Sequence, residues 1–91
     1  MSINDNWLTE AVQDCRAGKG DRLGEISCII QSLKEHEGGQ QFLAVGEHRL
    51  TAVIEEGLDM ADAERDEGRP SAAQECVLMI CDLLGIEYGA L

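Results

Sequence analysis

The chain has 91 residues, of which 44% are apolar and 27% are charged, and this composition indicates one small folded domain rather than a disordered chain. Eighteen acidic residues against seven Lys and Arg give a formal net charge of −11. Because nucleic-acid backbones and anionic membranes repel such a charge, we expect direct binding to neither. The start of the chain lacks the basic and apolar regions of a signal peptide, and no apolar run could span a membrane, so we expect a cytoplasmic protein.

Apolar residues recur at helical spacing almost throughout, which predicts an all-α fold: four helices in a small, bundle-like single domain over residues 1–91. The first helix is expected from about Asn4 to Ala17, with Asn4 as its N-cap and Ile3 packed against Leu8. Residues 18–20, Gly-Lys-Gly, stop it and form a turn. Its inner stripe is expected to be Trp7, Leu8, Ala11, Val12 and Cys15.

The second helix is expected to begin near Asp21, which serves as its cap, and to end at Gly38 and Gly39. One side of this helix is apolar at every step of three or four residues. The apolar side consists of Leu23, Ile26, Ile29, Ile30 and Leu33.

The third element, from about Gln40 to Glu67, contains two glycines and is either one long helix or two helices broken at Gly46. At 100° per residue, the phase of the apolar face does not shift across Gly46, so we expect one helix of about 40 Å. Gly46 and Gly57 both fall on the inward face, where a missing side chain lets another helix approach closely. That face comprises Phe42, Leu43, Gly46, Leu50, Val53, Ile54, Gly57 and Ala61.

A fourth helix is expected from Ala72 to Leu84, opened by the capping-box sequence of residues 71–74 and stopped by Gly85. Residues 86–91 form a tail that is expected to dock through Ile86 and Tyr88. Apolar side chains cover about two-thirds of this helix, which exceeds what three short helices can cover. We therefore expect the uncovered apolar part of this helix to meet a second copy of the chain. The homodimer would be joined through Leu78, Met79 and Leu83.

The cysteines lie within apolar helical patterns, and without a secretory signal they are expected to be buried free thiols rather than disulfides. Two of them on the fourth helix are five residues apart and point in different directions. The four residues are Cys15, Cys28, Cys76 and Cys81.

The sequence offers little for catalysis or metal binding. His36 lies in the charged end of the second helix and His48 on the outer side of the third, so neither is expected to reach an inward cysteine. Zinc-binding cysteine pairs are absent. Asp62, Glu64 and Asp66 imitate the first ligands of an EF-hand, but Glu67 stands at its glycine position and no glutamate closes the loop. We expect no enzyme, no metal site and no cofactor.

One feature departs from an ordinary helical surface, namely an acidic run in the third element. Between Glu55 and Glu67 there are seven acids and one base, Arg65. Four of the acids are spaced four, three and four residues apart, so on a helix they form one column opposite the apolar face, with axial steps of about 6, 4.5 and 6 Å. Three like-charged pairs at this spacing cost about 1 kcal/mol in total, and pairs of Asp62 with Arg65 and of Asp66 with Arg69 are expected to relieve part of this repulsion. The column consists of Glu55, Asp59, Asp62 and Asp66, flanked by Glu56 and Glu67.

A charged run opposite an apolar face is most often a solvated surface, yet such surfaces usually mix both signs of charge. The uncompensated column therefore suggests attraction to a basic protein surface. We hypothesise a non-enzymatic helical interaction module with these six acids as its binding residues. In size and charge the chain resembles small acidic phage-encoded inhibitors that occupy the nucleic-acid groove of a target complex, so that groove is one candidate partner. Homodimeric assembly through the fourth helix is the alternative.

Overall fold

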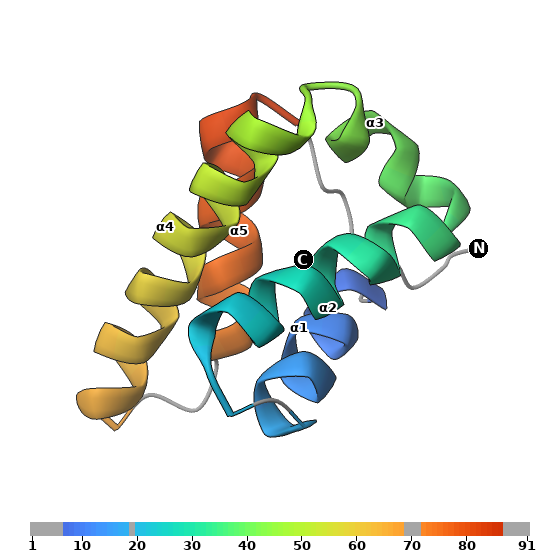
Figure 1. Ribbon diagram of the computed structural model, residues 1–91. Helices are drawn as coiled ribbons and strands as arrows, with labels where there is room; N and C mark the ends of the chain where they lie inside the picture. The colour runs from blue at the N-terminus through green and yellow to red at the C-terminus, as the bar shows by residue number, and fades with distance from the viewer. Residues whose placement is uncertain (1–6, 19, 69–71, 87–91) are drawn as a thin grey trace.

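The computed structural model describes residues 7–18, 20–68 and 72–86, and within these ranges the protein is all-α, with no strand (Figure 1). The predicted caps at Asn4 and Ser71, and the tail residue Tyr88, lie outside the described residues. Its helices are α1 (Trp7–Gly18), α2 (Arg22–Glu35), α3 (Gln40–Leu43), α4 (Glu47–Asp66) and α5 (Ala72–Leu84), with a short 3₁₀ helix at Glu37–Gly39.

Helix α2 begins where the sequence predicts, because the carboxylate of Asp21 accepts a hydrogen bond from the backbone N–H of Gly24 at 2.7 Å. It ends at Glu35, three residues before the predicted glycines. His36 adopts an extended backbone, and its Nδ1 accepts a hydrogen bond from the N–H of Gly38. A Cβ atom at Gly39 would lie 2.1 Å from the carbonyl oxygen of Leu33, so only glycine lets the 3₁₀ helix pack against the end of α2.

A disulfide between Cys15 and Cys28 joins α1 to α2, with the two Cα atoms 5.7 Å apart. The expectation of four free thiols was therefore wrong for this pair. Both residues lie on the faces that α1 and α2 turn toward each other, and helical phase alone does not show that the two cysteines reach the same level. Cys76 and Cys81 are free and buried, as expected.

The expected long third helix is broken at Gly46, which has φ +95 and serves as the N-cap of α4. Gly46 is exposed, so its expected place on the inward face was also wrong. The two segments pack on different neighbours: α3 lies against α2 and buries Phe42, whereas α4 pairs with α5. Unbroken phase across Gly46 reports which residues are apolar, not whether the backbone continues in one direction.

Helices α4 and α5 form an antiparallel pair, with α1 and α2 packed to one side of it (Figure 1). Gly57 allows the close approach that was predicted, because a Cβ atom there would lie 2.9 Å from both the carbonyl oxygen of Cys76 and Cγ1 of Ile80. Helix α5 has the predicted limits. Gly85, with φ +70, follows its end, and the N–H of Ile86 closes the last turn on the carbonyl of Cys81 at 2.9 Å.

The core is a single cluster of apolar side chains drawn from α1 to α5. Most of the predicted inward residues belong to it or pack against it, and besides Gly46 the main exception is Leu23. Leu23 is 74% exposed, because it sits in the first turn of α2, where no other described element covers it. None of the helices in the described ranges is long and apolar enough to cross a membrane. The largest fully buried side chains are Phe42, Leu8, Ile29, Leu33, Leu50, Ile54, Leu58 and Ile80.

Candidate partner-binding surface

The six predicted binding residues all lie on α4 or directly after it, but they are not equally accessible. Asp62 is half-buried, whereas the other five are exposed. Of those five, Glu55, Glu56 and Asp66 form no ion pair within the described part of the chain. The five exposed acids are Glu55, Glu56, Asp59, Asp66 and Glu67.

Three arginines converge on the carboxylate of Asp62. Arg16, in the last turn of α1, reaches Oδ1 at 2.6 Å, and Arg65 reaches the same oxygen from one turn along α4 at 3.2 Å. Arg22, in the first turn of α2, binds Oδ2 and also lies 3.3 Å from Asp59. The side chain of Arg16 is only 10% exposed. This ion network therefore ties α1 and α2 to α4 near the turn that joins the first two helices.

The expectation that the acidic column is uncompensated was wrong for its two middle residues, Asp59 and Asp62. Asp62 is neutralised by arginines of its own chain, and Asp59 shares one of them. Sequence spacing predicted the local pair of Asp62 with Arg65, which is confirmed, but it considered only neighbours on the same helix. Arg16 and Arg22 arrive from other helices, so their approach depends on tertiary packing. The expected pair between Asp66 and Arg69 lies outside the described residues.

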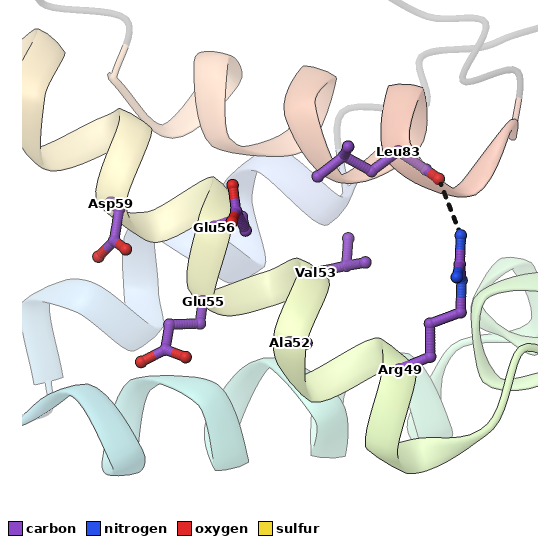
Figure 2. Close-up of a pocket in the computed structure, with 7 residues that line it drawn as sticks. All are labelled: Arg49, Ala52, Val53, Glu55, Glu56, Asp59 and Leu83. Atoms are coloured by element: carbon purple, nitrogen blue, oxygen red, sulfur yellow. Dashed lines mark hydrogen bonds between the residues drawn. The ribbon is translucent and has the colours of Figure 1, made fainter.

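The acids nearer the start of α4 border a shallow groove between α4 and α5, with a volume of about 450 Å³ (Figure 2). Val53 and Leu83 give it an apolar floor, and Arg49 donates a hydrogen bond to the carbonyl oxygen of Leu83 at 3.4 Å. Glu55 and Asp59 point to one side of α4, and Glu56 lies on the side toward α5 (Figure 2). We call this the acidic groove; its lining is Arg49, Ala52, Val53, Glu55, Glu56, Asp59 and Leu83.

The residues expected at a dimer interface all lie on α5 and are only partly covered. Leu78 is 39% exposed and Leu83 is 40% exposed, and Met79 is half-buried. A second depression of about 350 Å³ lies beside them and includes Met60 of α4. Its remaining lining, Glu75 and Asp82, adds two more acids to an apolar floor.

The free thiols do not form a reactive centre. Burial raises the pKa of Cys76 from 9.0 to about 12, although Arg16 and Arg22 lower it in part, and burial raises the pKa of Cys81 to about 11. Both thiols therefore stay protonated near neutral pH, and a protonated thiol is a poor nucleophile. Residues 7–18, 20–68 and 72–86 contain no group of three or more His, Cys, Asp or Glu side chains placed to hold a metal ion.

His36 has a role that sequence reasoning missed. Its side chain is exposed, but its ring stacks on Trp7, with ring centroids 3.8 Å apart and planes 5° from parallel. Phe42 also meets Trp7 edge-on, with ring centroids 6.5 Å apart. The only indication of this contact in the sequence is that few aromatic residues are available to pack together. His48 is exposed, as expected.

Comparison with known proteins found no matching family model, no similar curated protein and no similar solved structure. The fold and the surface together thus describe a small acidic all-α protein, whose function has to be argued from its own residues.

Proposed function

We propose that the protein is a non-enzymatic helical interaction module that binds a basic protein surface through the acidic groove. The supporting observation is that Glu55 and Glu56 are exposed beside an apolar floor and form no ion pair with the described part of the chain. Lys and Arg combine a charged end with an apolar stem, so their side chains suit a groove of this kind. The net charge of −11 draws a basic partner from a distance.

The ion pairs of Asp62 weaken one form of the proposal, in which the acidic column occupies a nucleic-acid groove. A column of four free carboxylates would imitate the spacing of backbone phosphates, but the arginines around Asp62 leave Glu55 and Glu56 separated from Asp66 by a neutralised stretch. Occupation of a nucleic-acid groove is therefore one form of the proposal, supported by size and net charge alone. The general form requires only a basic protein surface.

Reversal of two charges tests this function. The variant Glu55→Lys/Glu56→Lys changes the net charge from −11 to −7, because each substitution adds two units. We expect it to lose a basic protein that wild type captures from a cell extract at low salt, and we expect that capture to weaken at physiological ionic strength, where the Debye length is about 8 Å.

A matched control separates a specific groove from a general field effect. Glu10→Lys/Asp14→Lys makes the same change in net charge at two exposed positions of α1. This control is expected to retain the partner. Equal loss in both variants, or retention in both, would contradict the role of the acidic groove. Nucleic-acid competitors, added to the captured complex, then show whether the partner surface is one that binds DNA or RNA.

Homodimeric assembly through α5 is the second candidate, favoured by the exposure of Leu78 and Leu83 on that helix. Leu78→Asp is expected to abolish any association that sedimentation detects across a range of protein concentrations. Leu23→Asp is the control, because Leu23 is more exposed still but lies on α2. A protein that stays monomeric at all concentrations would rule this candidate out.

A further inference from the structure

The two cysteines of the disulfide differ in their exposure to solvent. Cys15 is only 1% exposed, within the core, whereas Cys28 is half-buried on α2. Cys28 borders an open depression of about 520 Å³ whose lining is otherwise small or polar. The lining consists of Gly24, Ser27, Cys28, Gln31, Ser32 and Glu35.

The disulfide is also adjacent in sequence to one arginine of the Asp62 ion network. It joins α1 to α2, and the residue after Cys15 is Arg16, which binds Asp62 on α4. Arg22, at the start of α2, binds the same carboxylate. The disulfide and the ion network therefore constrain the same two helices, and a disulfide with this sequence separation of 13 residues contributes substantially to the stability of a small domain.

We propose that the Cys15–Cys28 disulfide is a reversible thiol–disulfide exchange site, attacked at Cys28 by a small thiol or an exposed dithiol. Opening it releases α1 from α2 and loosens the hold of Arg16 and Arg22 on α4. This inference is independent of the proposed partner. It concerns a second property of the chain, namely that its stability responds to the thiol reductants around it.

The exchange is a two-electron reduction. A thiolate of the reductant attacks the sulfur of Cys28, the bond between the two cysteine sulfurs breaks, and Cys15 leaves as a thiolate that takes up a proton. A second thiol of the reductant then attacks the mixed disulfide, so the reductant becomes a disulfide and Cys28 becomes a thiol. The reverse reaction, with a low-molecular-weight disulfide as oxidant, restores the bond.

Charge predicts which reductants react fastest. The attacking thiolate approaches a protein of net charge −11, and Glu35 lies at the edge of the depression. At low salt, cysteamine, which carries an ammonium group, is expected to react at least about three-fold faster than mercaptoethanesulfonate, relative to their rates with a neutral model disulfide. The difference should shrink as salt is added, because screening weakens the field.

A destabilised variant tests whether the reductant attacks the folded protein. Gly57→Ala disturbs the packing of α4 on α5, because its methyl group meets Cys76 and Ile80, neither of which belongs to the disulfide or lines the depression beside Cys28. With cysteamine as the probe, we expect the rate of reduction in this variant to stay within about two-fold of wild type. If reduction requires prior unfolding, its rate will instead rise by the same factor as the unfolding equilibrium constant, and that result would overturn the proposal.

Single-cysteine variants identify the sulfur that is attacked. Cys15→Ser leaves the thiol of Cys28, and Cys28→Ser leaves that of Cys15; both lose the disulfide, so they are matched in that respect. After treatment with cystamine, peptide mass spectrometry is expected to show the mixed disulfide forming at least about ten-fold faster at Cys28 than at Cys15. Equal rates would contradict attack at Cys28. The wild-type rates above remain decisive should either variant fold poorly.

The link to the ion network is measured by a double-mutant cycle. The factor by which Asp62→Asn raises the unfolding equilibrium constant is determined once in oxidised protein and once in protein held reduced by dithiothreitol. We expect a factor at least about three-fold smaller in the reduced form, because Arg16 and Arg22 then no longer hold Asp62 firmly. The same factor in both forms would show that the disulfide and the network are independent, contrary to the proposal.

Discussion

A methyl group at position 57 would be 2.9 Å from the carbonyl oxygen of Cys76, which is backbone and cannot move aside alone. Gly57→Ala is therefore expected to lower the free energy of unfolding by about 1–3 kcal/mol, although alanine is the better helix former. Urea denaturation followed by circular dichroism measures the change.

Gly18→Ala is the control for this substitution. Gly18 is the last residue of α1, and a Cβ atom there would meet nothing within 4 Å. The free energy of unfolding should stay within about 1 kcal/mol of wild type or rise slightly. If Gly57→Ala behaved like Gly18→Ala, the close approach of α5 to α4 would be wrong.

The two free thiols predict how stability varies at alkaline pH. Burial raises the pKa of Cys76 to about 12 and that of Cys81 to about 11, so between pH 9.0 and these values the unfolded chain loses protons that the folded protein retains. Their contribution to stability is complete below pH 9.0 and is lost as the pH rises toward 11 and 12. Urea unfolding at a series of alkaline pH values should show a decline that becomes shallower in Cys76→Ala. An unchanged slope in that variant would contradict the burial of this thiol.

At the scale of the elements, Gly46 decides between one helix and two. In a continuous helix, Gly46→Ala would stabilise the protein by about 1 kcal/mol. In the structure Gly46 has φ +95, where a Cβ atom is strained, so the same substitution is expected to destabilise by about 1–2 kcal/mol. The two arrangements give opposite signs, and thermal or urea denaturation is sufficient to distinguish them.

Sequence patterns predicted the elements well where a capping residue or a glycine marks the end of a helix. Asp21 began α2 as expected, and Gly85 followed the end of α5. They failed at Gly46, because the apolar phase continues while α3 and α4 turn to different helices. They failed also at Leu23, which keeps the apolar spacing of α2 but extends past the elements that could cover it. Such outcomes depend on where the neighbouring helices lie, which local spacing does not contain.

At the scale of the whole molecule, Asp62 joins three helices through its arginine partners. Asp62→Asn keeps the shape of the side chain but removes its charge, which leaves Arg16 and Arg22 partly buried with less compensation. We expect the free energy of unfolding to fall by about 1–3 kcal/mol. The measurement is urea denaturation at low salt.

Asp66→Asn provides the comparison one turn along the same helix. Asp66 is exposed and forms no ion pair with the described part of the chain, so its substitution should change the free energy of unfolding by less than about 0.5 kcal/mol. Equal effects of the two substitutions would mean that the network around Asp62 contributes nothing to stability.

The sequence predicted which acids form the candidate site, but not which of them are paired with arginines. The sequence placed all six acids on one segment, and five of them are exposed. Asp62 departed from expectation because Arg16 and Arg22 are far from it in the chain and reach it only after folding. The disulfide escaped prediction for the same reason. Two inward cysteines on neighbouring helices are compatible with a bond or with separate burial, and the relative level of the helices decides between them.

The stack of Trp7 on His36 provides the chain with a built-in optical probe. Trp7 is the single tryptophan, so indole emission reports only on the place where α1 meets the segment after α2. The circular dichroism signal, in contrast, comes from all the helices, including the α4–α5 pair. If the N-terminal hairpin opens before that pair, the emission midpoint will precede the dichroism midpoint, and coincident curves will show that the molecule unfolds as one cooperative unit.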